Sequence, residues 1–205
     1  MTHFLKAVIL ILCLAPAFVQ AQQFNAGIKG GISATQISGD NLAGYDKAGI
    51  FLSPFVNVYI SPYAAIQMEI GFIQKGSRKN PNPEKNDFTE YRLNLNYLEI
   101  PLLYRLDFND AFSAEGGFSL AALVGSNEEA YPPIAPPPDF NQLDVGLILG
   151  GYFHFADQWY ANVRLSHSIL PVREHRSGAT YRLNHGQYNS VLILAIQYQI
   201  NRSQQ

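Results

Sequence analysis

Three things are scarce in this 205-residue sequence: cysteine, charge and long apolar runs. The single cysteine, Cys13, lies near the N-terminus, so the rest of the chain can form no disulfide and no cysteine-based metal site. Charged residues make up 15% of the chain, and there is no basic patch of the kind that nucleic-acid binding needs. Beyond the N-terminal segment no apolar run is long enough for a transmembrane helix. A membrane-embedded chain of this kind would therefore have to be a β-barrel.

Residues 1–21 are predicted to be a cleaved secretory signal peptide. Lys6 precedes an apolar run over residues 7–14, and residues 19–21 supply the small side chains that a signal peptidase recognises. The alternative is an N-terminal membrane anchor, which is disfavoured because the apolar run is too short to span a bilayer. We expect residues 22–205 to form one domain.

The remaining sequence is dominated by alternation of apolar and polar residues. Period-two alternation is typical of β-strands that have one apolar face. In one such segment Ile66 and Met68 share a face, while Gln67 and Glu69 share the other. Eight segments fit this pattern: 24–36, 47–60, 63–75, 91–106, 112–125, 141–155, 159–168 and 188–200.

The connections between these segments alternate between short and long. Three short turns lie at residues 60–63, 107–111 and 156–158, and four long polar connections lie at 38–46, 76–90, 126–141 and 169–187. Short turns at one end and long loops at the other are typical of bacterial outer-membrane barrels. The predicted fold is all-β: an eight-stranded antiparallel up-and-down transmembrane β-barrel, with periplasmic turns and extracellular loops.

Aromatic residues support this orientation. Nine of them lie beside the short turns or near the two chain ends. They are Phe24, Tyr59, Tyr63, Phe108, Phe112, Phe155, Trp159, Tyr160 and Tyr198. Amphipathic rings favour the membrane–water interface, so we predict that they form a periplasmic girdle. The alternative is that they are core aromatics of a soluble sandwich.

The segment at residues 97–106 is the most informative strand. Its even-numbered residues are apolar, whereas Glu99 and Pro101 lie on the other face. A carboxylate in mid-strand suits a strand with one face toward lipid and the other toward the barrel interior. Upstream, Leu93 and Leu95 are apolar on the opposite parity, so we predict a change of face near residue 97 and a bulge near Pro101.

Tyr97-Leu-Glu-Ile-Pro-Leu-Leu-Tyr-Arg105 resembles the central strand of the PorT-like outer-membrane β-barrel family of Bacteroidetes-type bacteria. The resemblance extends from residues 27–33 to the C-terminal strand. It implies an outer-membrane location and a barrel fold. It implies no particular activity, and a role accessory to secretion or surface assembly follows from the family name alone.

Six charged residues fall on the inward parity of six predicted strands: Lys29, Glu69, Glu99, Glu115, Asp144 and Arg164. An eight-stranded barrel is filled by its own side chains, so these groups are expected to pair or to share protons and water. We interpret them as a structural polar network of the lumen. The alternative is a proton or ion relay.

No catalytic, cofactor-binding or metal site is predicted. Ser166-His167-Ser168 resembles the serine–histidine pair of outer-membrane lipid A deacylases, but adjacent residues of a strand point to opposite faces. His175 and His185 share one long loop without a cysteine or carboxylate pattern typical of a metal site. No phosphate-binding glycine loop occurs, and no cofactor is expected.

We therefore expect a non-enzymatic outer-membrane protein with a structural or interaction role at the cell surface. Its predicted partners are outer-membrane lipid and other envelope proteins contacted through the extracellular loops, and no nucleic acid. The stiff, proline-rich segment at residues 130–139 suits such contacts, and the alternative is a solvated loop that has no partner. Two alternatives remain: a lipid-modifying barrel enzyme, and a soluble lipocalin-like barrel with its apolar residues turned inward.

Overall fold

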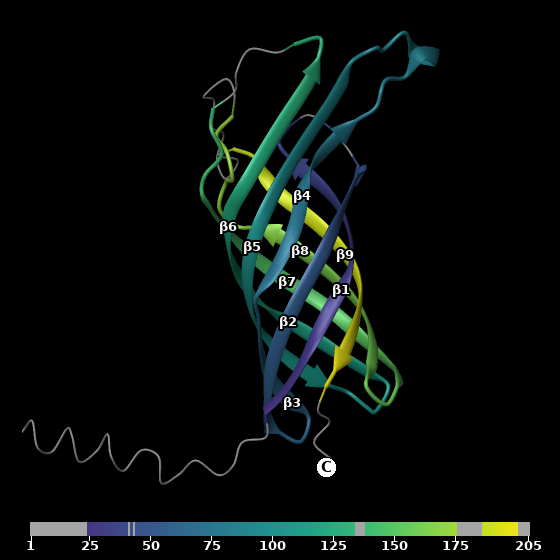
Figure 1. Cartoon of the computed structure of the whole chain (residues 1–205), viewed down its shortest axis with the longest axis vertical. Coiled ribbons are helices and arrows are strands. Elements are labelled where there is room, and N and C mark those ends of the chain that lie inside the picture. The colour runs from purple at the N-terminus through teal and green to yellow at the C-terminus, as the bar shows by residue number, and fades with distance from the viewer. Residues whose placement is uncertain (1–23, 41, 43, 134–137, 176–185, 201–205) are drawn as a thin grey trace, which may run out of the picture.

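The computed structural model describes residues 24–40, 42, 44–133, 138–175 and 186–200, and the predicted signal peptide lies outside them. The described part forms nine strands and one short 3-10 helix (Figure 1): β1 (Phe24–Ser38), β2 (Lys47–Ser61), β3 (Ala64–Glu69), β4 (Gly71–Lys79), η2 (Pro83–Lys85), β5 (Glu90–Asp107), β6 (Phe112–Tyr131), β7 (Leu143–Ala156), β8 (Trp159–Ser168) and β9 (Tyr188–Gln199). The described residues include no helix that is long and apolar enough to cross a membrane.

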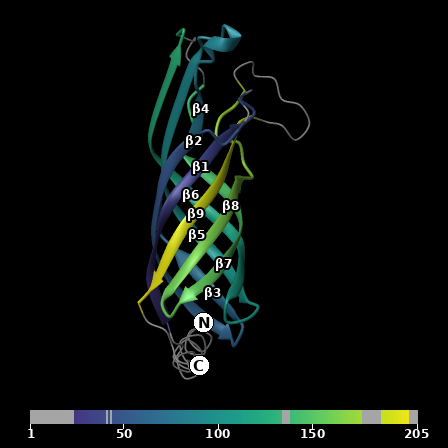
Figure 2. The same cartoon turned by 90° about the vertical axis from the view of Figure 1, so that its right-hand side faces the viewer.

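The strands form one antiparallel sheet whose pairing returns to its starting strand. Apart from β3 and β4, neighbours in the chain pair with one another, and β1 pairs with both β2 and β9. Strands β3 and β4 are separated by Ile70 and both pair with β2 and β5, so together they occupy the place of the single strand predicted at 63–75. The result is an all-β, antiparallel, barrel-like fold (Figures 1 and 2).

The short connections lie at one end of the barrel and the long ones at the other, as the sequence predicted (Figure 1). Four strands run further than predicted into the long-loop end: β1 to Ser38, β4 to Lys79, β5 from Glu90 and β6 to Tyr131. Strands β5 and β6 stay paired to their tips, where Glu90 faces Tyr131. Part of each connection predicted at 76–90 and 126–141 therefore belongs to a three-stranded extension of β4, β5 and β6, which rises beyond the other strands in both views (Figures 1 and 2).

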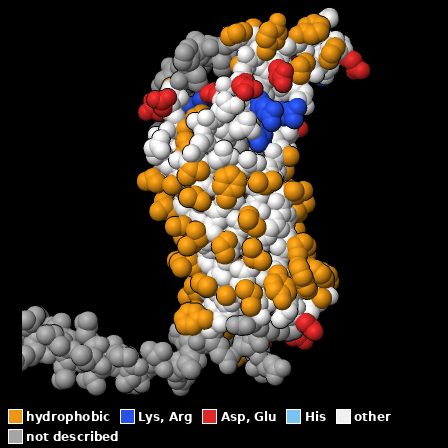
Figure 3. Space-filling model, viewed as in Figure 1, with side chains coloured by type: hydrophobic (Ala, Val, Ile, Leu, Met, Phe, Trp, Pro, Cys, Tyr) orange, Lys and Arg blue, Asp and Glu red, His pale blue; other side chains and the backbone are white. Residues whose placement is uncertain are grey.

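The part of each strand nearer the short turns, which is the lower part in Figure 1, turns its apolar face outward. On β5 the side chain of Leu102 is 57% exposed, whereas that of the next residue, Leu103, is 2% exposed. Apolar side chains cover the middle of the barrel wall, and charged ones gather near its ends on the face shown (Figure 3). The soluble lipocalin-like alternative is wrong, because it requires apolar residues inside and a polar outer wall.

The predicted change of face near residue 97 does not occur. Leu93, Leu95 and Tyr97 are fully buried on the same parity as Glu99. Pro101 pairs in register with a residue of β6, so the bulge is not there either. The register instead shifts between Asn96 and Tyr97 because β6 carries an extra residue, Val124, opposite this point. The bulge therefore lies in the partner strand, and β5 runs on without changing face.

Most of the aromatic residues predicted for the girdle are exposed at the short-turn end, among them Phe24, Tyr63 and Phe108. Tyr160 is an exception, because it is buried and its ring lies 4.5 Å from that of His154. It stands on the inward parity of β8, next to the outward-facing Trp159. Proximity to a turn was thus insufficient to assign its face.

In the half of the barrel nearer the long connections, which is the upper half in Figure 1, β4 lies close to β1 and narrows the interior. Strand β4 pairs with β2 at only two positions and then approaches β1, whose inward hydroxyls donate to its carbonyls. The Ser33 Oγ–Gln74 O and Thr35 Oγ1–Gly76 O distances are both 2.9 Å. A Cβ on Gly49 would lie 2.6 Å from Gln74 O, so a larger residue there would block this approach.

Candidate functional site: the filled interior and its cap

The lower interior holds an ionic cluster of four side chains from four strands. Arg164 of β8 places its Nη2 2.7 Å from Glu69 Oε1 and its Nε 2.8 Å from Glu115 Oε1. Lys29 of β1 lies 2.9 Å from Glu69 and 3.8 Å from Glu115. The Tyr152 hydroxyl donates to Glu115 at 2.6 Å and accepts from Lys29 at 2.7 Å. Two cations and two anions are thus balanced, and every charged side chain is at most 1% exposed.

A second ionic cluster lies among other strands. Lys75 of β4 places its Nζ 3.0 Å from Glu99 of β5 and 3.0 Å from Asp144 of β7. Asn189 of β9 donates to Asp144 at 2.8 Å, and Ser119 of β6 donates to Glu99 at 3.1 Å. All five side chains are buried or nearly so. The lysine holds together two carboxylates that would otherwise repel one another.

The structure places all six predicted lumen residues in the interior, but in two clusters. Lys29, Glu69, Glu115 and Arg164 come together, whereas Glu99 and Asp144 belong to the second group. The structural role of this network stays a prediction.

The predicted lumen network did not include Lys75, Tyr152 or Arg105. Lys75 continues the inward parity of Gln67 and Glu69, but it stood at the end of a predicted strand and was left uncounted. Tyr152 continues the parity of Asp144, and its hydroxyl was not considered. Arg105 is buried near the short-turn end, where its guanidinium lies 4.8 Å from the Tyr152 ring. Carrying the period-two count to the strand ends would have found all three.

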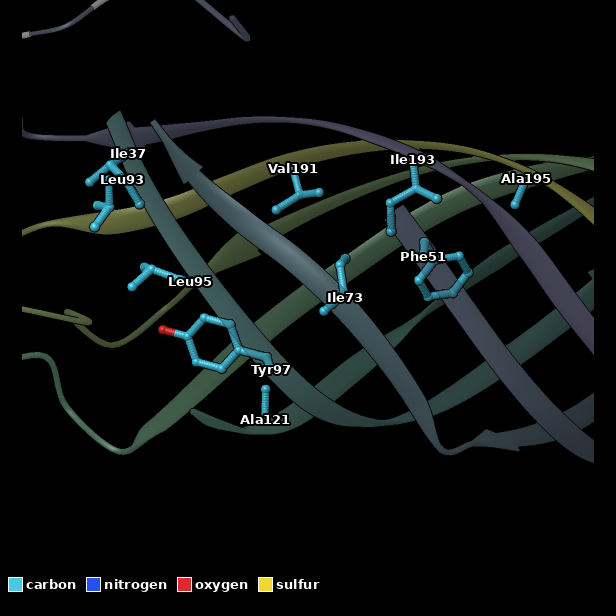
Figure 4. Close-up of a cluster of buried hydrophobic side chains, with 10 residues drawn as sticks. All are labelled: Ile37, Phe51, Ile73, Leu93, Leu95, Tyr97, Ala121, Val191, Ile193 and Ala195. Atoms are coloured by element: carbon cyan, nitrogen blue, oxygen red, sulfur yellow. The ribbon is translucent and has the colours of Figure 1, made fainter. Parts of the chain in front are cut away.

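The upper interior is filled by apolar side chains (Figure 4). These come from strands β1, β2, β4, β5, β6 and β9 and comprise Ile37, Phe51, Ile73, Leu93, Leu95, Tyr97, Ala121, Val191, Ile193 and Ala195. The pinching of β4 toward β1 brings these faces together, so the mouth of the barrel resembles the core of a sandwich. On β4 and β9, Lys75 and Asn189 lie nearer the long-loop end than Ile73 and Val191, so the apolar cluster and the second ionic cluster overlap in height. The lower ionic cluster lies nearer the short turns, since Lys29 on β1 and Glu115 on β6 stand below Ile37 and Ala121.

The connection between β8 and β9 adds a cap to the apolar cluster. Val172 is fully buried, and its backbone N–H donates to Gln187 O at 2.7 Å. Arg173 lies 2.7 Å from Glu128 of β6, and its guanidinium lies 4.1 Å from the Phe140 ring. The cap therefore ties together segments that follow β8, precede β7 and precede β9. Part of the connection predicted at 169–187, including His185, lies outside the described residues.

His167 does have a serine partner, but not one of its neighbours in the sequence. Ser166 and Ser168 point inward and are buried, whereas His167 is exposed on the outer wall. Its Nδ1 lies 2.7 Å from Oγ of Ser190, the residue opposite it on β9. The Ser190 hydroxyl also lies 3.3 Å from that of Ser38. Sequence reasoning missed this pair because it crosses two strands.

Among the described residues, no group of three or more His, Cys, Asp or Glu side chains is arranged to hold a metal ion. The carboxylates of the interior are instead bound to Lys and Arg, as the distances above show. The arrangement can hold the strands at a fixed spacing and close the lumen, which is what buried and hydrogen-bonded ion clusters do when every member has a partner.

A sequence model of the family described as "Outer membrane protein beta-barrel domain" matches residues 20–173. Among solved structures, Ail of Yersinia pestis in a phospholipid bilayer nanodisc gives a TM-score of 0.50 at 10% identity, covering 87% of this chain and 100% of Ail. The crystal structure of Ail with the heparin analogue sucrose octasulfate gives 0.49 at 10% identity, covering 87% and 99%. Neisserial surface protein A (NspA) gives 0.48 at 11% identity, covering 85% and 96%. At these identities the similarity is one of fold. No curated protein matches the sequence.

Proposed function

Because this chain belongs to the outer membrane protein β-barrel domain family, we propose that it spans the outer membrane as an eight-stranded up-and-down barrel. In this proposal the nine strands of the sheet count as eight crossings, since β3 and β4 are two parts of one. The short turns face the periplasm and the long connections face the outside, following the usual asymmetry of bacterial barrels. The barrel acts as a structural or interaction protein at the cell surface, and neither as a pore nor as an enzyme.

The filled interior is the observation that carries this proposal. A solute crossing the barrel would have to pass the cap, then the apolar cluster together with the second ionic cluster at the same height, and then the lower ionic cluster. Arg164 alone makes hydrogen bonds to carboxylates on two other strands, β3 and β6. Displacing such a side chain would leave buried charges without partners.

The three-stranded extension of β4, β5 and β6 is the proposed working surface. It raises two large exposed side chains, those of Phe88 and Tyr131, well beyond the barrel wall. The pairing of β6 with β7 ends at Ala122, while its pairing with β5 continues to Tyr131. Exposed aromatic side chains on a preorganised strand suit contact with another envelope protein. The proline-rich candidate at 130–139 adjoins this surface, although residues 134–137 lie outside the described part.

A narrower role, as an accessory of secretion or surface assembly, rests on the resemblance of residues 97–105 to the PorT-like family. We keep it as a hypothesis that crosslinking can test. Photo-crosslinkers placed at Phe88 and Tyr131 in intact cells should capture the same envelope protein. A crosslinker at Phe108, at the short-turn end, should not capture it. Capture of that protein from Phe108 alone would show that the extension is not the contact surface.

Conductance tests the proposed closure of the interior. Purified protein inserted in planar lipid bilayers should give no steady current of porin size, because the lumen is occupied by its own side chains. Reproducible open-channel currents from the folded protein would contradict the proposal. The Arg164→Ala variant serves as a comparison, since it removes the largest side chain of the lower ionic cluster.

A second candidate function rests on the Ser190–His167 pair at the outer wall. A hydroxyl 2.7 Å from an imidazole is the arrangement of an activated serine, which would attack an acyl ester of a membrane lipid. In the described part of the chain no hydrogen bond or ion pair joins His167 to a carboxylate, so the third member of the usual triad has no counterpart there. Mass spectrometry of outer-membrane lipids decides between the candidates: loss of acyl chains with the natural protein, but not with Ser190→Ala, would make it an enzyme.

A further inference from the structure

Three basic side chains gather at the base of the extension. Arg78 of β4 and Arg92 of β5 are exposed and stand directly opposite one another in the register. Lys47, at the start of β2, is buried on the inward parity of that strand but lies within electrostatic reach of both. Lys and Arg side chains are visible in this part of the surface, immediately beyond the apolar wall (Figure 3).

These cations lack acidic partners within the part of the chain that the structure describes. None of the three forms an ion pair within 4.0 Å there, and Lys47 Nζ donates only to the carbonyl of Ala48, at 3.0 Å. Glu129 faces Arg92 across the β5–β6 pair, but its carboxylate accepts from Asn127 instead. Like charges directly opposite one another destabilise a sheet, so the arrangement favours an anion supplied from outside the chain.

The height of the cluster on the barrel limits what this anion can be. On β5 the outward side chains change from Leu98 to Asn96 and Asn94, and Arg92 follows. Asn96 accepts a hydrogen bond from Gln74 at 3.2 Å, so the amides form a polar step just above the lipid-facing wall. The arginines stand one step higher, where headgroups would lie. Their guanidinium groups present forked donors that match phosphate oxygens, and their flexible stems can reach down toward the membrane boundary.

We propose that Arg78 and Arg92 bind a phosphate group of lipid A in the outer leaflet, and that the charge of the buried Lys47 adds attraction at a distance. The proposal rests on the membrane-spanning orientation proposed above. The lipid phosphate supplies the missing negative charge of the cluster. The contact also fixes the base of the extension against the membrane surface, so that the extension projects in a defined direction.

Native mass spectrometry of the folded protein, with bisphosphorylated lipid A as the probe, tests the proposal. The double variant Arg78→Gln/Arg92→Gln should bind about thirty-fold more weakly, since each basic residue at an anionic surface contributes about 1 kcal/mol and 1.4 kcal/mol is tenfold. The control Lys79→Gln/Lys85→Gln removes the same number of charges from the same extension and should keep the natural affinity. Heat-modified migration on gels shows that both variants are folded.

Three outcomes would overturn the proposal: natural affinity in the arginine double variant, equal binding of fully dephosphorylated lipid A, or equally tight binding of inorganic phosphate alone. The last would indicate a site for free anions. Insertion of the natural protein into phosphatidylcholine vesicles is measured first. If it does not insert, the proposed membrane-spanning function fails; if it inserts but does not bind lipid A, only this inference fails.

Discussion

The lower interior of the barrel is filled by charged side chains, whereas the upper interior is mainly apolar and holds a lysine with two carboxylates. In the lower part Arg164 and Lys29 meet two carboxylates behind a lipid-facing apolar wall. In the upper part Leu93 and Leu95 are buried, while the outward neighbours on the same strand are Arg92 and Asn94. Along β5 the same parity of residues points inward throughout. The inward face is polar in the lower part and apolar in the upper part, and the outward face shows the reverse.

In the proposed membrane-spanning orientation, this inversion marks where the strand leaves the membrane. Where lipid covers the wall, the outward face must be apolar and polar groups are confined to the interior. Where water covers the wall, the strand needs an apolar inward face for stability, as in a soluble protein. Asn96 and Asn94 mark this passage on β5, and Gln74 marks it on β4. The same inversion led the sequence analysis to predict a change of face near residue 97.

The largest effect should come from the lower ionic cluster. Arg164→Met removes the partner that Glu69 and Glu115 share, and leaving buried charges uncompensated costs about 3–5 kcal/mol. Urea unfolding in lipid vesicles measures this. Arg173→Met removes an arginine of the cap that has one partly exposed carboxylate partner, so it should cost clearly less. Equal costs for the two variants would show that burial in the barrel does not set the energetics of these ion pairs.

A comparable but smaller loss is expected in the upper apolar cluster. Leu95→Ala leaves a cavity among buried side chains and should cost about 2–5 kcal/mol, whereas Leu95→Met keeps the volume and should cost under about 1.5 kcal/mol. The same urea titration compares the two. If the alanine variant is as stable as the natural protein, the upper interior is not closely packed.

The outer wall should show a dependence on height. Leu102→Lys places a charge on the apolar belt and should cost about 2–4 kcal/mol if it lies near the bilayer midplane. Asn94→Lys adds the same charge on the same strand and face, but above the predicted membrane boundary, and should be nearly neutral. A severe effect at residue 94 together with a neutral one at residue 102 would invert the placement of the belt.

The smallest effect is expected at the tip of the extension. Hydrogen bonds from Lys79 and Thr89 hold the pKa of Asp87 below its usual range. Since the folded-state pKa is lowered, the contact stabilises the tip above the unfolded-state pKa and is lost as the pH falls through the folded-state value. Asp87 is fully exposed, so Asp87→Asn should leave global unfolding unchanged. NMR of the Thr89 amide should still show a local change, and a shift of the global transition would refute the assignment.

The strand pattern could be predicted from the sequence because lipid imposes a strict alternation on the lower part of each strand. The inward positions of Glu69, Glu99 and Arg164 follow from the same alternation. The grouping into two clusters could not be predicted, because it depends on which strands lie across the lumen from one another. The pinch of β4 toward β1 and the Ser190–His167 pair were likewise hidden, because both depend on contacts between strands distant in the sequence.

Site-directed labelling in intact cells tests the central claim most directly, namely that the chain crosses the outer membrane with its long connections outside. The lone cysteine, Cys13, lies in the predicted signal peptide, so a single new cysteine can be labelled without interference. A membrane-impermeant maleimide should label Asn82→Cys, next to η2, and should label Asn109→Cys, in the β5–β6 turn, only after the cells are opened. Labelling of Asn109→Cys but not Asn82→Cys in sealed cells would contradict the account.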